Sequence, residues 1–183
     1  GLGMARGMAE AGAAIMVAGR NAEKNAAAVA ELQGLGADAA AVEVDVTDQA
    51  SCQAMVAAAE QRFGRVDCLV NNAGTSIRKQ PQDYDLSEWH TVLTTNLTSA
   101  FTCSQAVYPL MRAQGGGKIV MIGSMMSIFG ASFSAPYASS KGGIVQLGKS
   151  LASSWAKDNI QVNTVLPGWI DTELTIKARE QVD

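Results

Sequence analysis

The stretch VDCLVNNAG, residues 66–74, restricts the fold more than any other part of the sequence. A short and mostly apolar run, Val66 to Val70, ends in two amide residues, an alanine and a glycine. Such a run predicts a strand covered on both faces and followed by a turn. On either side of it, similar runs predict four more strands: Ala14 to Ala18, Ala39 to Val44, Lys118 to Ile122 and Gln161 to Leu166.

Longer, Ala-rich stretches with helical periodicity separate these runs: Ala22 to Leu35, Ser51 to Phe63, Ser87 to Ala113 and Pro136 to Lys157. Strands that alternate with helices of this length predict a parallel sheet with helices on both faces. We therefore expect an α/β protein with a Rossmann-type, doubly wound sheet. Glycines after several of these stretches mark helix ends, and Ser87 with Glu88 is expected to open the third helix.

The beginning of the sequence departs from this pattern. Gly1-Leu2-Gly3 runs directly into a helical stretch, Met4 to Ala11, with no strand before it. In a doubly wound sheet the strand before a glycine-rich turn is central, and its loss leaves two neighbouring strands with unpaired backbone groups. We expect residues 1–183 to form a single dinucleotide-binding catalytic domain that lacks its first strand, its C-terminal strand and its substrate lid.

The composition argues against several classes of function. The 183 residues are 48% hydrophobic and 17% charged, as in ordinary globular proteins. A net charge of -3 provides no basic stripe for a nucleic acid backbone. No apolar run reaches the roughly 18 residues that cross a membrane, so we expect a cytoplasmic protein without membrane partners. Three scattered cysteines and a single histidine, His90, do not form a metal-ligand pattern, and we expect the cysteines to be buried, reduced thiols.

Two segments predict a dinucleotide site. Gly1-Leu2-Gly3 matches the end of a phosphate-binding turn, where backbone N–H groups and a helix N-terminus approach a pyrophosphate; alone, it also fits an ordinary turn or a tag remnant. The strand from Ala14 ends in Gly19-Arg20, where an acid would bind the ribose hydroxyls of NAD. Because Arg20 offers a guanidinium that can hold a 2'-phosphate, we expect NADP(H) to be favoured over NAD(H). The alternative for Arg20 is a solvated surface charge.

Two further strand ends extend this site. Asp45 can accept a hydrogen bond from an adenine amino group while Val46 packs against the ring, although aspartates in this position also cap helices. Asn72, Ala73 and Gly74 follow a strand with small and amide side chains, which suit close approach of a cofactor. A plain turn would use similar residues.

The candidate catalytic group lies farther along the chain. Tyr137 and Lys141 are four residues apart on a predicted helix, so both side chains project from one face. A nearby ammonium favours a phenolate, which lets the tyrosine exchange a proton near neutral pH. Ser124 follows a strand and can hold the substrate oxygen, and Asn96 is expected to fix a water that links Lys141 to solvent. Without a cofactor site, a Tyr-x-x-x-Lys match would indicate only an amphipathic helix.

Together these residues resemble the short-chain dehydrogenase/reductase family, in the branch with an Asn-Asn-Ala-Gly motif and an Asn-Ser-Tyr-Lys tetrad. The resemblance spans nearly the whole sequence. It implies hydride transfer between a nicotinamide cofactor and an alcohol or ketone, with catalytic residues Asn96, Ser124, Tyr137 and Lys141. It also implies that Tyr137 and Lys141 contact the cofactor.

The resemblance has consequences for the C-terminal part and for assembly. It implies that Pro167, Gly168, Ile170 and Thr172 border the nicotinamide, and that the protein forms a homotetramer or homodimer through the helices that carry Asn96 and Tyr137. The sequence looks most like sugar-acid and polyol members of the family, with 3-oxoacyl carrier-protein reductases as the alternative. A catalytically silent NADP-sensing protein is the alternative from another class.

Overall fold

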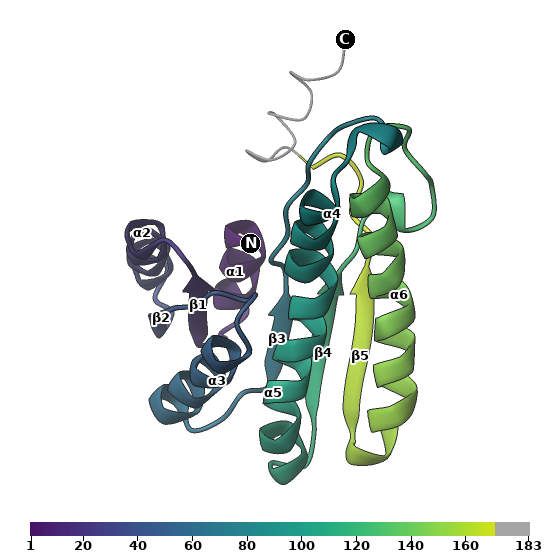
Figure 1. Ribbon diagram of the computed structural model, residues 1–183. Helices are drawn as coiled ribbons and strands as arrows, with labels where there is room; N and C mark the ends of the chain where they lie inside the picture. Colours follow the sequence, from purple (N-terminus) through teal and green to yellow (C-terminus); the bar gives the residue numbers. More distant parts are fainter. Residues whose placement is uncertain (171–183) are drawn as a thin grey trace.

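The structure, a computed structural model, describes residues 1–170 (Figure 1). Its helices and strands follow in the order α1 (Leu2–Glu10), β1 (Ile15–Gly19), α2 (Ala22–Gly34), β2 (Ala39–Glu43), α3 (Gln49–Phe63), β3 (Cys68–Asn71), η1 (Pro81–Asp83), α4 (Leu86–Leu93), η2 (Thr94–Thr98), α5 (Ser99–Ala113), β4 (Gly117–Ile122), η3 (Met125–Ser127), α6 (Ala135–Trp155), η4 (Ala156–Asp158) and β5 (Ile160–Val165). The element η2 is a π-helix, whereas η1, η3 and η4 are 3-10 helices.

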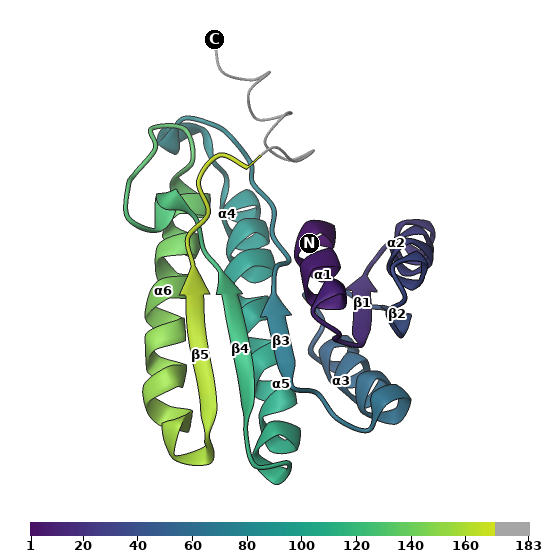
Figure 2. The same ribbon diagram turned by 180° about the vertical axis from the view of Figure 1, so that it is seen from behind.

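The strands form two parallel sheets. One sheet contains β1 and β2, and the other has the order β3-β4-β5. The strands β3, β4 and β5 all end at the same edge of their sheet, with α5 and α6 packed on one side (Figures 1 and 2). Within the described residues β1 and β3 are both edge strands. The arrangement confirms the expected α/β class.

The predicted elements are all present, and each of their ends lies within two residues of the predicted position. The expected helix Ser87 to Ala113 is one continuous helical segment, but its middle turn is a π-helix. The expectation that Ser87 opens this segment was wrong. Asp85 is the N-cap, because its carboxylate accepts the Glu88 N–H at 2.9 Å while the Glu88 side chain accepts the Asp85 N–H.

Local chemistry explains other boundaries. Asp48 caps α3 by accepting the N–H groups of Ala50 and Ser51. Gly64 ends the same helix in the left-handed conformation, at φ 76°. Gly116 has φ 146°, and a Cβ there would lie 2.7 Å from the Asn159 carbonyl oxygen. Only glycine therefore fits between α5 and β4 at this position.

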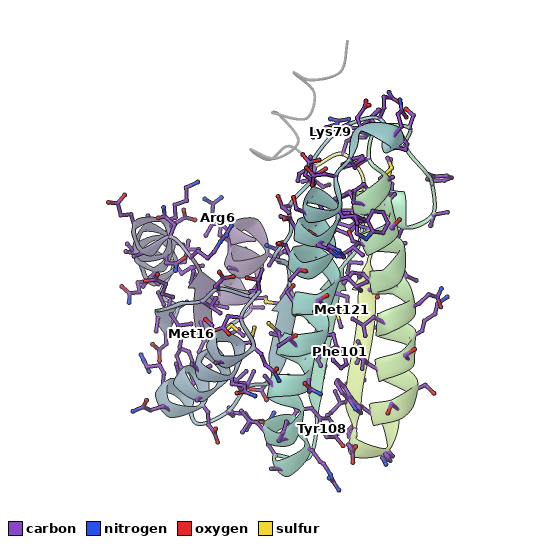
Figure 3. The ribbon with its side chains drawn as sticks, in the orientation of Figure 1. Arg6, Met16, Lys79, Phe101, Tyr108 and Met121 are labelled. Carbon is purple, nitrogen blue, oxygen red and sulfur yellow. The ribbon has the colours of Figure 1, made fainter. Side chains whose placement is uncertain are left out.

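Two hydrophobic cores stabilise the two sheets. The larger core joins α3, α5 and α6 to the three-stranded sheet, and its fully buried members include Val107, Ile119, Met121 and Ile144. The smaller core holds α1 and α2 against β1 and β2: Ala9, Ile15, Leu32 and Ala39. In Figure 3, Met121 marks the larger core and Met16 lies on the two-stranded sheet.

Three sequence expectations concern surfaces and ligands. Among residues 1–170, no helix combines the length and the apolar character needed to cross a membrane. The same residues contain no group of three or more metal-ligating side chains placed to hold a metal ion. Cys52 and Cys103 are buried, but the expectation that all three cysteines are buried was wrong, because Cys68 is exposed at the start of the edge strand β3.

Candidate active site

The catalytic candidates gather where the strands of the larger sheet end. Tyr137 and Lys141 lie in the first two turns of α6, and the Lys141 Nζ is 5.7 Å from the centroid of the Tyr137 ring. Tyr137 is half-buried, so its ring is partly accessible to solvent. The expected common face of this pair is therefore present in the structure.

Lys141 is an unusual lysine because it is only 4% exposed. Its Nζ donates a hydrogen bond to the Ile122 carbonyl oxygen at 2.7 Å, at the end of β4. Burial lowers the pKa of Lys141 to about 8, because the charged ammonium has lost contact with water. A buried amine with one backbone partner has further N–H groups that can bind an oxygen of a ligand.

Asn96 lies in the π-helical turn between α4 and α5 and is 2% exposed. Its side chain bridges two distant segments, because Oδ1 accepts the Thr75 N–H at 2.7 Å and Nδ2 donates to the Thr75 carbonyl at 3.0 Å. Nδ2 also donates to Ser140 Oγ at 2.9 Å, and Ser140 Oγ donates to the Tyr137 carbonyl at 2.7 Å. Asn96 thus connects the loop after β3 to the turn of α6 that carries Tyr137. π-turns within α-helices are frequent at functional sites.

Ser124 lies two residues after the end of β4 and is the N-cap of η3. Its Oγ accepts the Met126 N–H at 3.2 Å, which uses a lone pair and leaves the hydroxyl hydrogen able to donate. The Ser124 backbone is extended, with φ -165° and ψ 166°. Ser124 is therefore a candidate donor to a substrate oxygen.

The glycines and amides expected at the cofactor lie at the starts and ends of several elements. Gly1 is the N-cap of α1 and has no side chain with which to cap it, so the first-turn N–H groups can face an anion. A Cβ on Gly1 would lie 3.1 Å from Asn72 Nδ2, whereas a Cβ on Gly3 would meet no atom within 4 Å. Gly1 therefore lies close to the segment after β3, Gly3 is open on the side where a Cβ would stand, and Leu2 begins the helix.

Gly74 lies beside the catalytic candidates. A Cβ there would be 3.4 Å from Asn96 Oδ1 and 3.7 Å from Lys141 Nζ. The missing side chain leaves space above the buried lysine. Ala73 and Gly74 are both exposed, which fits a segment that a flat ring system can approach.

Asp45 and Arg20 end neighbouring segments of the smaller sheet. Asp45 does not cap α3, since Asp48 does so; its Oδ1 accepts both the N–H and the hydroxyl of Thr47, at 2.9 and 2.7 Å. These bonds lower the pKa of Asp45, the hydroxyl bond most strongly. Arg20 is exposed just beyond β1, and Val46 is half-buried next to Asp45.

The C-terminal candidates are only partly within the described residues. Pro167 accepts the Met125 N–H at 3.1 Å, which holds the segment after β5 against η3. A Cβ on Gly168 would lie 3.4 Å from Met125 Sδ, and Ile170 is 56% exposed. Thr172 lies outside the described residues.

The sequence reasoning missed Thr75 and Ser140. Thr75 contributes only backbone groups, so its side chain carries no signal. Ser140 did carry one: it is a fully buried polar residue three positions after Tyr137, at the spacing from which a serine bonds back to a helix carbonyl.

These residues fit a nicotinamide dinucleotide. The uncapped N-terminus of α1 suits its phosphates, and the glycine cradle at Gly74 leaves room above the buried Lys141 amine. Gly1, Gly74 and Lys141 would therefore contact the cofactor, which supplies hydride donation or acceptance when bound.

Comparison with known proteins is consistent with this chemistry. The family model for short chain dehydrogenases matches residues 1–183. The fold and this match define the class as NAD(P)-dependent oxidoreductases that act on CH–OH groups. The chain belongs to the short-chain dehydrogenase family.

Several known proteins align with nearly the whole of this chain. Gluconate 5-dehydrogenase of Gluconobacter oxydans (strain 621H) is 37% identical over 175 residues, which are 96% of this chain and 68% of that protein. A crystal structure of a gluconate 5-dehydrogenase from Burkholderia cenocepacia J2315 in complex with NADP and tartrate has 37% identity and a TM-score of 0.92, covering 99% of this chain and 72% of that one. The crystal structure of an NAD+-bound xylitol dehydrogenase has 34% identity and a TM-score of 0.94. The match covers 98% of this chain and 69% of that one. This chain spans about two thirds of the length of its relatives.

Proposed function

We propose that the protein interconverts a secondary alcohol and a ketone on a sugar acid or polyol, with NADP(H) favoured over NAD(H). The observation that carries the chemistry is the buried Lys141 amine beside the Tyr137 ring, at the edge where Ser124 and Asn96 also lie. The substrate class rests on the gluconate and xylitol dehydrogenases among the similar proteins. One of these structures holds NADP and the other NAD+, so the cofactor preference rests on Arg20.

In the direction of reduction, the Ser124 hydroxyl donates to the substrate carbonyl oxygen and fixes its position. Tyr137 then donates its phenolic proton to that oxygen as general acid, and it accepts the proton in the reverse direction. The Lys141 ammonium stabilises the negative charge that develops on the phenol oxygen. Asn96 holds the loop after β3 against this turn of α6 through Thr75 and Ser140.

The rest of the cofactor site is assigned by position. The N-terminus of α1, formed by Gly1, Leu2 and Gly3, would hold the phosphates, and Asp45 with Val46 would border the adenine. The nicotinamide end would be bordered by three groups of residues: Asn72 to Gly74; Tyr137 and Lys141; and Pro167, Gly168, Ile170 and Thr172.

A substrate panel tests the reaction. We expect the purified protein to consume NADPH, measured by its absorbance, faster with keto sugar acids or polyol-derived ketones than with 3-oxoacyl thioesters. Preference for the thioesters would favour the 3-oxoacyl reductase alternative. Tight NADPH binding without turnover on any substrate would favour the silent sensing protein and contradict the proposal.

A substitution tests the cofactor preference. Arg20→Ala should raise the KM for NADP about tenfold or more and leave the KM for NAD nearly unchanged, because only NADP carries the 2'-phosphate. Arg65→Ala is the matched control, since Arg65 is also exposed but pairs with Asp67. Equal effects of the Arg20 change on both cofactors would show that Arg20 is an ordinary surface charge.

We further propose that the protein works in the cytoplasm as a homotetramer or homodimer that uses α5 and α6. In support, the large side chain of Phe101 on α5 is 43% exposed (Figure 3). Light scattering tests this assembly, and a monomer at micromolar concentration would contradict it.

A further inference from the structure

Ser127 lies beside the candidate catalytic residues, but the proposed chemistry does not use it. It is the last residue of η3, three positions after Ser124, and it is half-buried. Neither a charge nor a metal-ligand pattern draws attention to it. Its contacts, however, join two of the candidate catalytic residues.

The Ser127 hydroxyl makes hydrogen bonds in two directions. Its Oγ accepts the Ser124 N–H at 3.2 Å, and its O–H donates to the Lys141 carbonyl oxygen at 2.7 Å. The Ser127 N–H also donates to the Ser124 carbonyl at 2.9 Å. A hydroxyl has one hydrogen to donate, and here that hydrogen goes to the helix that carries Tyr137 and Lys141.

The bridge connects segments that are otherwise held by different elements. Ser124 lies in the segment between β4 and η3, whereas Lys141 belongs to α6. The Lys141 side chain bonds to the end of β4 through the Ile122 carbonyl. The two bonds of Ser127 and the bond of Lys141 Nζ therefore close a ring of contacts between the end of β4 and the second turn of α6. Within this ring the Ser124 peptide has a fixed position relative to Lys141.

We propose that Ser127 is a positioning residue, which sets the distance between the Ser124 hydroxyl and the Tyr137–Lys141 turn. The inference rests on the proposed function, because only a reaction that uses Ser124 and Tyr137 on the same substrate oxygen depends on this distance. A misplacement of about 1 Å at a reacting group can cost about 10²-fold in rate. Most of the proposed cofactor contacts, by contrast, lie on α1, the smaller sheet and the segment after β3.

The test is Ser127→Ala, which removes only the hydroxyl group and with it both side-chain hydrogen bonds. We expect kcat to fall about 10- to 100-fold while the KM for NADP and the melting temperature change little. Ser127→Thr retains the hydroxyl and should recover most of kcat. Ser139→Ala is the matched control, because Ser139 is exposed on the same helix, next to Ser140, and should leave kcat unchanged.

Two results would overturn the proposal. In the first, Ser127→Ala keeps the kcat of Ser139→Ala. In the second, kcat, cofactor affinity and melting temperature all fall together and Ser127→Thr does not restore them, which would make Ser127 a general structural residue. Neither result contradicts the proposed reaction. That proposal would fail instead if Tyr137→Phe kept the kcat of the wild type.

Discussion

The molecule has a larger half, built on the sheet β3-β4-β5, and a smaller half, built on β1 and β2. In each half a buried asparagine links segments that are distant in the sequence. In the larger half, Asn96 bridges Thr75 and Ser140 and is 2% exposed. In the smaller half, Asn25 is 8% exposed, and its Nδ2 donates to the Gly19 carbonyl at 2.8 Å and the Val42 carbonyl at 3.4 Å. One amide fixes the candidate catalytic turn, and the other fixes the strand end that precedes Arg20.

The surroundings of the two amides differ. The catalytic candidates stand on an extensive core of fully buried side chains, whereas β1 and β2 rest on the small cluster of Ala9, Ile15, Leu32 and Ala39. Lys141 is buried, but Arg20 and Asp45 are exposed. Changes in the larger half should therefore act on kcat, and changes in the smaller half should act on cofactor KM.

Among the substitutions that compare the two halves, the largest effect is expected for Lys141→Met. Loss of the ammonium should reduce kcat about 10³-fold, because no cation then stabilises the developing phenolate. An unchanged kcat, measured at saturating cofactor and substrate, would remove Lys141 from the mechanism and would erase the functional contrast between the two halves.

The same substitution has a pH signature in the cofactor-free protein. Burial lowers the pKa of Lys141 to about 8, from an ordinary value of 10.5. Below about pH 8 the folded protein bears the cost of a buried charge; between about pH 8 and 10.5 the unfolded chain binds more protons, so stability rises with pH. Lys141→Met should lack this rise.

Denaturant unfolding measures this difference. The free energy of unfolding of the wild type relative to Lys141→Met should increase by about 3 kcal/mol between about pH 7 and pH 11. Lys149→Met, on the exposed part of the same helix, is the control. If the difference in the free energy of unfolding between wild type and Lys141→Met stays constant with pH, burial does not lower the pKa of Lys141.

Asn96→Ala should have the next largest effect. It leaves the Thr75 N–H without its acceptor and frees Ser140, so we expect kcat to fall about 10- to 100-fold with a smaller change in the KM for NADP. Steady-state kinetics check this split. A rise in cofactor KM alone would mean that Asn96 serves the cofactor loop rather than the catalytic turn.

Asn25→Ala should have the smallest effect on turnover. Removing its amide leaves the ends of β1 and β2 without a side-chain link, which should raise the KM for NADP several-fold and cost about 1–3 kcal/mol of stability. If kcat instead falls as far as in Asn96→Ala, the prediction that the smaller half acts on the cofactor KM and the larger half on kcat is wrong.

The sequence predicted the elements well because their signals are local. Apolar runs and helical periodicity located the strands and long helices of residues 1–170 within two residues, and the spacing of Tyr137 and Lys141 predicted their common face. Asp85 as a helix cap was missed because Ser87 and Glu88 offered a competing local pattern.

The bridges of Asn25 and Ser127 were beyond local patterns. Asn25 bonds a carbonyl 17 residues away, and Ser127 bonds one 14 residues away. Whether a polar side chain on an apolar face finds such a partner depends on the packing of distant segments. Tertiary contacts of this kind have no fixed spacing in the sequence, so sequence reasoning located the catalytic candidates but not the groups that hold them.

The role of Tyr137 as proton donor can be measured by comparing Tyr137→Phe with the wild type, by cofactor titration and by turnover on the best substrate of the panel. The ring remains and only the phenolic oxygen is lost, so NADPH affinity should stay within about twofold while kcat falls about 10²- to 10⁴-fold. Turnover at the wild-type rate with intact NADPH binding would contradict the assignment of Tyr137 as the proton donor.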